Sequence, residues 1–215
     1  NLASASASEI YSAAIQDYER GIVIGSTTTG KGTAQVQLDT LAYGQATLTQ
    51  RKFYRVTGGS TQNKGVVPDI KLVDIYNEEF GERKAKNALK WDTIPTAPFK
   101  REGSVQPYIQ NLAQLSQQRV VNDPQFKYLE QRKAIAKKTD EQKRVVLDID
   151  QRKAELNALE QQTLESENQR RAVTGQKPYA NWESYQASID ALIESRAKMK
   201  AAKRPALAEE EVFVT

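Results

Sequence analysis

The composition of the chain changes near residue 95, and this change most constrains how the sequence can fold. The first part is rich in Gly, Thr and β-branched residues, whereas Gln, Lys, Glu, Ala and Arg predominate after it. β-Branched residues favour strands, while Ala, Lys, Glu, Gln and Arg favour helices. The 215 residues suffice for one or two domains. We therefore expect a first part that contains strands and a second part that is helical.

The charge balance and two missing residue types exclude several classes of protein. Lys and Arg total 31 and Asp and Glu total 27, a net charge of +4, and no basic run carries interleaved aromatic residues, so nucleic-acid binding is not expected. The sequence contains no run of about 18 apolar residues, so it predicts no membrane-spanning helix. The absence of Cys and His excludes disulfides, thiol nucleophiles, His-ligated zinc and a Ser-His-Asp triad. A hydrolytic site would need Lys or a carboxylate as its base.

The first part of the chain carries both helix and strand patterns. Residues 4–18 place Ala, Ile and Tyr at helical spacing, which predicts an amphipathic helix. Three β-branched residues at 22–24, between two glycines, predict a buried strand. Two-residue alternation predicts further strands at residues 35–38, 46–49 and 52–56. Turns are expected at 39–40 and 43–44, and an extended segment at 67–69 leads out of this part of the chain.

The second part is expected to be helical after a polar connector at residues 76–104. Apolar residues at helical spacing predict helices over most of 106–203, and the very polar stretch 151–171 predicts a solvated helix. Residues 174–178 should break the chain before the last helix. The Val-Val-Leu run at 145–147 could form a strand of its own.

A glycine-rich loop at residues 25–31 nearly matches the phosphate-binding P-loop pattern. Gly32 stands where that pattern needs Ser or Thr to hold Mg²⁺. The residues after Thr33 alternate as a strand, whereas a P-loop leads into a helix whose N-terminus receives the phosphates. Both departures argue against a nucleotide site, and we expect no cofactor.

A run of serines and one lysine could supply a nucleophile and a base. Residues 4–9 (SASASE) begin the predicted helix, where free N–H groups can stabilise an oxyanion, although Ser-x-x-Glu is also an ordinary capping box. Helical phase puts Ser4 and Ser8 on one face and Ser6 nearly opposite, so the residues leave open which serine reacts. Lys31 is either a surface charge or a base that has lost its proton in an apolar pocket. With no His, a Ser/Lys dyad is the pair these residues can build.

Five motifs carry a resemblance to a known family. They are residues 4–10 (SASASEI), 16–18 (QDY), 30–35 (GKGTAQ), 52–62 (KFYRVTGGSTQ) and 64–70 (KGVVPDI). They resemble the C-terminal processing peptidase family, in its tail-specific protease branch. The resemblance implies an α/β fold, a partial ClpP/crotonase-like protease core over residues 1–75. A mainly α-helical C-terminal domain over 105–215 would follow the connector.

The resemblance also implies a serine endopeptidase and assigns roles to its residues. Ser6 would be the nucleophile and Lys31 the base, with Gln35 orienting the lysine. The backbone N–H of Ala7 would form half of the oxyanion hole. Asp17 matches a family aspartate that we interpret as structural, because about 16 Å of helix at 1.5 Å per residue separates it from Ser6.

Partners and a location are implied by the resemblance as well. The substrates would be proteins with disordered, apolar C-termini, met in the bacterial periplasm near the inner membrane with the help of a helical lipoprotein adaptor. Because the chain starts at Asn1 and lacks a PDZ domain and the first half of the core, we expect a C-terminal fragment that is inactive and poorly stable alone. The alternative is a non-catalytic scaffold on a protease-like fragment; the joint presence of Ser6, Lys31 and Gln35 argues against it.

Overall fold

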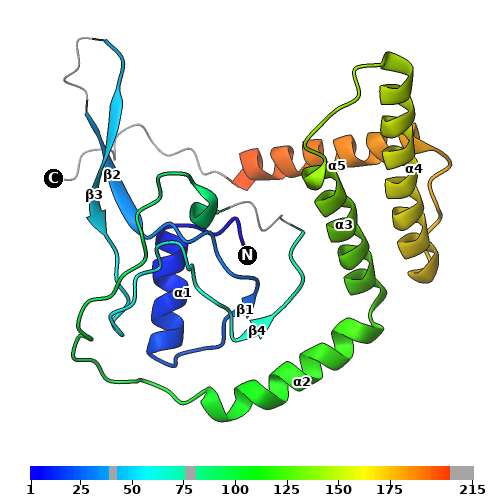
Figure 1. Ribbon diagram of the computed structural model, residues 1–215. Helices are drawn as coiled ribbons and strands as arrows, with labels where there is room; N and C mark the ends of the chain where they lie inside the picture. The colour runs from blue at the N-terminus through cyan, green and yellow to red at the C-terminus, as the bar shows by residue number, and fades with distance from the viewer. Residues whose placement is uncertain (39–42, 76–80, 204–215) are drawn as a thin grey trace. The chain divides into compact units, whose positions relative to one another are not determined.

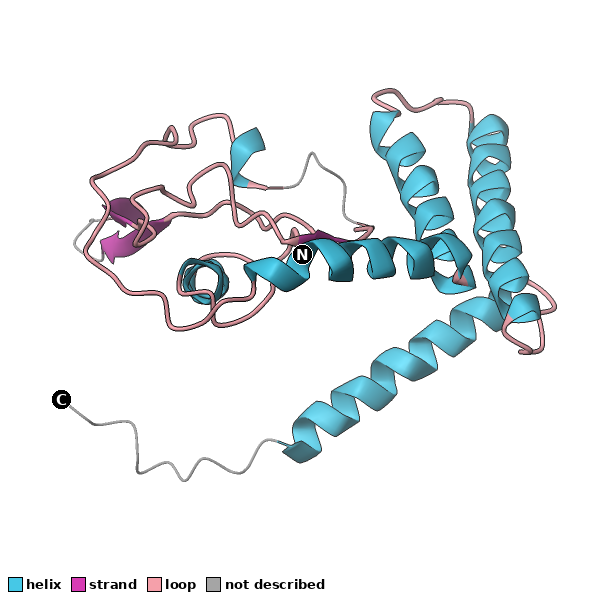
Figure 2. Cartoon of the chain, turned by 90° about the horizontal axis from the view of Figure 1, so that it is seen from below, coloured by secondary structure: helices cyan, strands magenta, loops and turns pink. Residues whose placement is uncertain are grey.

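The computed structural model describes residues 1–38, 43–75 and 81–203 (Figure 1 and Figure 2). The chain divides into two compact units, residues 1–143 and the residues from 144 onward. Helices predominate in the described residues, and the strands there are few, short and confined to the first unit. The expected order, a part with strands followed by a helical part, is therefore found.

Helix α1 spans Ala7–Asp17 and confirms the predicted amphipathic helix (Figure 1). Ala13 is buried on one side of it, whereas Ile10 is 46% exposed. The helix ends where the Tyr18 N–H bonds to the Ala14 carbonyl oxygen at 3.0 Å. Its apolar face is thus only partly covered by the described residues.

In the described residues, four strands form two separate two-stranded sheets. Strand β1 (Ile24–Gly25) lies parallel to β4 (Ile70–Lys71), which follows the extended segment predicted at residues 67–69. Strand β2 (Thr33–Leu38) pairs antiparallel with β3 (Ala46–Lys52), with a register shift between Ala34 and Gln35. The second sheet confirms the hairpin expected from two-residue alternation.

Two of the strand predictions are wrong. Ile24 is 57% exposed, so β1 is not a buried strand; β4 is its one strand neighbour in the described chain. Of residues 52–56, only Lys52 belongs to a strand. Lys52 pairs with Thr33, the first residue of β2, so the residues after Lys52 have no β2 residue opposite them. The predicted turn at 43–44 is present, whereas that at 39–40 lies outside the described residues.

The core of the first unit lies where residues 25–32 meet residues 61–66. The Gly32 N–H donates to the Gln62 side-chain oxygen at 2.9 Å, and Gln62 and Val66 are fully buried. A Cβ atom at position 32 would lie 2.4 Å from the Gln62 backbone nitrogen, so only glycine allows this approach. The residue that departs from the P-loop pattern therefore has a packing role.

Residues 92–97, which we call the strap, bind the segment that follows β3. The Ile94 N–H donates to the Gly58 carbonyl oxygen and the Ala97 N–H to that of Val56, both at 2.9 Å. A Cβ at position 58 would lie 2.2 Å from the Ile94 oxygen, so glycine is needed there as well. Part of the predicted connector is thus packed against the first 75 residues.

Helices α2 (Gln106–Asn122) and α3 (Pro124–Glu141) follow the connector as the sequence predicts. Asp123 separates them and caps α3, since its carboxylate accepts the Gln125 N–H at 2.7 Å. Tyr108 on α2 is 64% exposed. Among the helices that the structure describes, none combines the length and the apolar character needed to cross a membrane.

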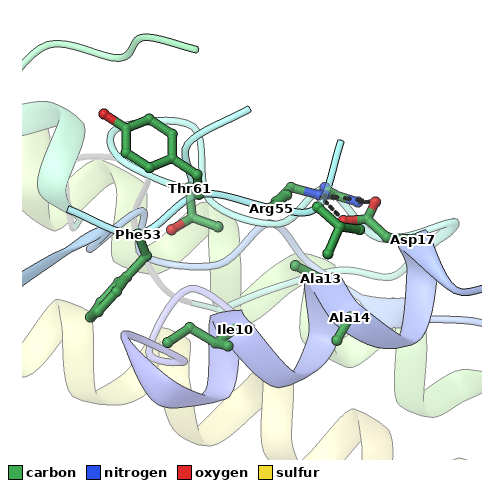
Figure 3. Close-up of a pocket in the computed structure, with 9 residues that line it drawn as sticks. Ile10, Ala13, Ala14, Asp17, Phe53, Arg55 and Thr61 are labelled. Carbon is green, nitrogen blue, oxygen red and sulfur yellow. Dashed lines mark hydrogen bonds and ion pairs between the residues drawn. The ribbon is translucent and has the colours of Figure 1, made fainter. Parts of the chain in front are cut away.

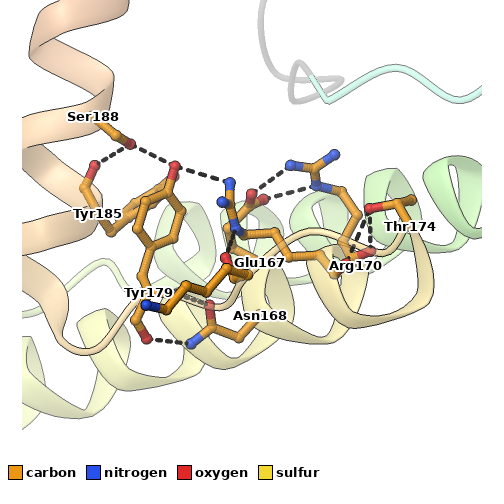
Figure 4. A network of polar contacts seen from close by, with 9 residues as sticks. Glu167, Asn168, Arg170, Thr174, Tyr179, Tyr185 and Ser188 are labelled. Carbon is orange, nitrogen blue, oxygen red and sulfur yellow. Dashed lines mark hydrogen bonds and ion pairs between the residues drawn. The ribbon is translucent and has the colours of Figure 1, made fainter.

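The second unit is a pair of helices, α4 (Ile149–Val173) and α5 (Trp182–Lys203), joined by a polar network (Figure 4). The Tyr179 hydroxyl, in the connection between them, accepts hydrogen bonds from Arg171 at 3.1 Å and Ser188 at 2.7 Å. The chain breaks between the helices at the predicted residues 174–178. One side chain thereby ties both helices together.

Two details of the helical prediction need correction. Residues 145–147 form no strand; Leu147 is 96% exposed and pairs with no other strand among the described residues. Helix α4 is not solvated all round, because Thr163, Ser166 and Glu167 are buried. Periodicity of apolar residues missed this face because its buried residues are polar.

The charge of Asp92 is expected to hold the strap in place. Its carboxylate lies 2.7 Å from the Lys52 ammonium and 3.2 Å from the Tyr54 hydroxyl. The hydrogen bond from Lys52, with that from Tyr54, holds the pKa of Asp92 below its ordinary value of 3.8, although desolvation opposes the shift. This stabilisation is complete above pH 3.8 and is lost as the pH falls through the lowered value.

Asp92→Asn should therefore lower the Tm at pH 7, and the difference from wild type should disappear well below pH 3.8. Thermal melts of both proteins across this pH range measure the effect. Asp140→Asn, an exposed change on α3, is the matched control and should leave the Tm unchanged. A difference that persists undiminished at the lowest pH would contradict the charged role of Asp92.

Candidate active site

The Glu9 carboxylate joins the start of α1 to the turn that carries Lys31. It accepts hydrogen bonds from the backbone N–H groups of Ser6 at 2.9 Å, Gly30 at 2.7 Å and Lys31 at 2.9 Å. The Thr28 hydroxyl donates to it as well. Because Glu9 is fully buried, these four donors replace the water that its two oxygens would otherwise bind.

This carboxylate brings two of the predicted site residues together. The backbone nitrogens of Ser6 and Lys31 each lie 2.9 Å from Glu9 Oε2, so they are separated by no more than twice that distance. The Ser-x-x-Glu pattern signalled the bond between Glu9 and Ser6. It gave no signal of the bonds to the turn, so sequence reasoning missed Glu9 as a site residue.

The backbone of Ser6 is held in a conformation that favours glycine. Its φ is +57° and its ψ is −115°, at the residue that precedes the first turn of α1. Holding a serine there costs about 1–3 kcal/mol, and such strain concentrates at active sites. A sharp, strained turn into a helix exposes the nucleophilic serine of α/β-hydrolases in the same way.

The other serines of the run have hydroxyls engaged in local hydrogen bonds. Ser8 Oγ donates to the Ala5 carbonyl oxygen at 2.9 Å, and Ser4 Oγ donates to Asn1 Oδ1 at 3.3 Å. Both have ordinary backbone φ values, unlike Ser6. The backbone conformation therefore sets Ser6 apart from the other two serines of the run.

Lys31 lies on the turn before β2 and Gln35 lies on β2, and no hydrogen bond joins their side chains among the described residues. Lys31 is half-buried, and its ammonium has no hydrogen-bond or ion-pair partner among the described residues. Gln35 Nε2 donates to Thr33 Oγ1 at 2.8 Å and to Thr49 Oγ1 at 3.3 Å. The expectation that Gln35 shares a side with Thr33 is confirmed, while its contact with Lys31 stays a prediction.

Ala7 is the first residue of α1, and its N–H is not used by any described residue. The residue is exposed, so this N–H is open to an approaching oxygen. Free N–H groups at a helix N-terminus can stabilise the oxyanion of acyl transfer. Across the described residues, no group of three or more acidic side chains could hold a metal ion.

Asp17 at the other end of α1 forms an ion pair with Arg55 (Figure 3). Arg55 Nη2 lies 2.5 Å from Asp17 Oδ1 and Nε lies 3.0 Å from Oδ2, a two-pronged geometry. Asp17 is 8% exposed. The pair fixes α1 to the segment after β3, which agrees with the structural role that we expected for Asp17; its partner Arg55 was not foreseen.

Comparisons with known proteins find matches along most of the chain. Residues 1–72 match Peptidase family S41, and residues 75–213, more than half of the chain, match the C-terminal domain of tail specific protease. The tail-specific protease of Haemophilus influenzae is 40% identical over 190 residues, which is 82% of this chain and 27% of that protein.

Two further relatives match the first part of the chain. The carboxy-terminal-processing protease of Bartonella bacilliformis is 41% identical over 80 residues, 37% of this chain and 18% of that protein. A probable CtpA-like serine protease of Staphylococcus haemolyticus is 36% identical over 72 residues, 34% of this chain and 14% of that protein. The chain thus spans a small share of each relative's length.

The match to Peptidase family S41 covers the segment that contains Ser6 and Lys31, and the match to the C-terminal domain of tail specific protease covers the rest of the chain to residue 213. With more than half of its residues in the C-terminal domain match, the chain belongs to the tail-specific protease family. The resemblance that the motifs suggested is therefore confirmed.

Glu9→Gln should destabilise the fold by about 2–3 kcal/mol, because an amide NH₂ would replace one oxygen that now faces only donors. Chemical denaturation of a full-length protease that carries this chain measures the loss. Glu130→Gln, an exposed change on α3, is the matched control and should stay within about 0.5 kcal/mol of wild type. Equal losses in both variants would contradict the role of Glu9.

Ser6→Gly should be more stable than Ser6→Ala by about 1 kcal/mol, because glycine adopts φ +57° without strain. Both variants lack the hydroxyl, so their difference reports on the backbone alone. Denaturation curves of the two variants measure it. If Ser6→Gly were the less stable of the two, the strained turn would not exist in solution.

Proposed function

We propose that a full-length protease carrying this chain is a serine endopeptidase with a Ser6/Lys31 dyad. It would degrade proteins that it recognises through their C-terminal tails. Membership of the tail-specific protease family supports the reaction class. In this proposal residues 1–75 contribute part of a ClpP/crotonase-like core, and residues 105–215 form the helical domain beyond the connector.

The observation that carries the proposal is that the backbone N–H groups of Ser6 and Lys31 both donate to the Glu9 carboxylate. One buried carboxylate oxygen holds the backbone of both residues at 2.9 Å. A nucleophile and its base must lie within reach of each other, and fixed backbones limit the positions open to both side chains. The strained φ of Ser6 and the unused N–H of Ala7 add to this support.

The reaction would proceed through an acyl-enzyme. Neutral Lys31 takes the Ser6 hydroxyl proton as Oγ attacks the scissile carbonyl carbon, and the Ala7 N–H stabilises the resulting oxyanion. Lys31 then gives this proton to the leaving amine as the peptide bond breaks. Water, deprotonated by Lys31, next attacks the ester and releases Ser6 with its proton restored. Gln35 would orient the lysine.

Partners and location follow from the family and belong to the same proposal. The substrates would carry disordered, apolar C-termini, and a helical lipoprotein adaptor would present them in the periplasm near the inner membrane. The chain alone would be inactive. Peptide cleavage by the isolated 215 residues at an ordinary rate would contradict this last point.

A non-catalytic scaffold is the second candidate, and exposed apolar residues on α2 favour it. Tyr108, Leu112 and Leu115 lie at helical spacing and are 39–64% exposed. A fluorophosphonate probe discriminates between the two functions, because it reacts covalently with an activated serine. Labelling that disappears in Ser6→Ala supports the protease, and absent labelling of a folded full-length protein supports the scaffold.

Lys31→Ala should slow degradation of an unstructured substrate with an apolar C-terminus by about 10²–10⁴-fold, because the general base is lost. The measurement uses the full-length protease and follows intact substrate with time. The Tm should stay close to wild type, since Lys31 binds Glu9 through its backbone.

Lys71→Ala is the matched control, because Lys71 is an exposed lysine on β4. It should degrade the substrate as fast as wild type does. If Lys31→Ala were equally fast, Lys31 would be only a turn residue and the dyad would be wrong, although family membership would stand.

A further inference from the structure

The turn that carries Lys31 is held from two sides. The peptide group before Lys31 donates its N–H to the buried Glu9 carboxylate at 2.9 Å. The peptide group after Lys31 donates the Gly32 N–H to Gln62 Oε1, also at 2.9 Å. Peptide groups are planar, so holding both of them restricts φ and ψ of Lys31 and, with them, the direction of its Cα–Cβ bond. Gln62 therefore shares with Glu9 the control of where the lysine side chain points.

The Gln62 amide can hold this peptide group in only one of its two orientations. Gly32 offers an N–H and needs the amide oxygen, whereas an amide turned over would present its NH₂ group instead. On its other side, Gln62 Nε2 donates to Glu82 Oε1 at 3.0 Å. An ionised carboxylate accepts hydrogen bonds and donates none, so Glu82 takes the NH₂ group and leaves the oxygen to Gly32. The residue at position 82 thus selects the orientation of the amide.

Burial makes this selection matter for the turn. Gln62 is fully buried, and its hydrogen bond with Gly32 is buried as well. Water does not replace a bond that is lost at such a place, so a turned amide would leave the Gly32 N–H without an acceptor. The peptide group after Lys31 would then shift toward another acceptor. A change at position 82 is in this way felt at Lys31.

The Glu82 backbone is attached to the same turn independently of its carboxylate. Glu82 begins the short 3₁₀ helix η1 (Glu82–Lys84), and its N–H donates to the Thr29 carbonyl oxygen at 3.0 Å. A side-chain change at position 82 leaves this backbone bond in place. Glu82 lies in the stretch that matches the C-terminal domain of tail specific protease, whereas Lys31 lies in the peptidase match.

We propose that Gln62 and Glu82 are positioning residues for the base Lys31. Glu82 selects the orientation of the Gln62 amide, the amide holds the peptide group after Lys31, and the lysine amine is thereby directed toward Ser6. The inference rests on the proposed protease function and adds to it two residues that act through Lys31. Because Glu82 belongs to the C-terminal domain match, that domain contributes to the reaction itself.

The test follows covalent labelling of Ser6 by a fluorophosphonate in the full-length protease. Its rate and final extent are measured in wild type, Glu82→Ala, Lys31→Ala and the double variant. We expect Glu82→Ala to be labelled about tenfold more slowly than wild type but to the same final extent, because a misplaced base slows the reaction. In the Lys31→Ala background the same change should leave the residual rate unaltered, because Glu82 acts only through Lys31.

Two further variants separate the hydrogen bond from the charge and from the site. Glu82→Gln keeps a side-chain oxygen that can accept from Gln62 Nε2, so it should be labelled at close to the wild-type rate. Glu102→Ala removes an exposed glutamate of the connector and is the matched control. It should be labelled as fast as wild type.

A wild-type labelling rate in Glu82→Ala would overturn the proposal. Equal slowing in both backgrounds, or a lower final extent at the wild-type rate, would overturn it as well, since either reports a general loss of structure. If Glu82→Ala does not fold, Glu82→Asp, whose carboxylate is one methylene further from Gln62, is measured in both backgrounds instead. If wild type is not labelled, or Lys31→Ala is labelled as fast as wild type, the proposed function or its dyad fails, and the positioning role fails with it.

Discussion

The buried carboxylate of Glu9 is the contact on which the geometry of the site depends. A carboxylate without water must have its oxygens satisfied by donors, and Glu9 obtains one from Ser6 and three from the loop at 25–31. The start of α1 and the Lys31 turn are therefore fixed to a common point. Neither can move without leaving a buried charge poorly solvated.

The strain at Ser6 and the fixed position of Glu9 belong together. The Ser6 N–H can reach Glu9 Oε2 while its backbone has a φ of +57°, and the four hydrogen bonds offset the cost of that conformation. The same turn leaves the next N–H, that of Ala7, at the start of the helix with no hydrogen-bond partner among the residues that the structure describes. One local arrangement thus fixes the Ser6 backbone and leaves the Ala7 N–H without a partner among the described residues, and the proposed acyl transfer would use both.

The two units are stabilised in different ways. In the first unit, contacts join residues far apart in the sequence, such as the Asp17–Arg55 pair and the strap. In the second unit, the contacts join neighbours on α4, α5 and their connection, such as Tyr179 with Ser188. A change to one residue of the first unit can therefore affect several elements, whereas the effect of one in the second stays local.

Periodicity and the serine–lysine motifs determined a good part of this protein by themselves. Helical spacing located α1 and the later helices, and two-residue alternation located the β2–β3 hairpin. The serine run and Lys31 stood out as a possible nucleophile and base because no His is present, and the family resemblance selected Ser6 from the run. These features are local, so a short stretch of sequence carries them. Only the tertiary structure decided that Glu9 joins Ser6 to Lys31, that Arg55 pairs with Asp17 and that residues 53–56 leave the sheet. Those outcomes depend on which distant donors meet a buried carboxylate and on where a partner strand begins, and no local pattern encodes either.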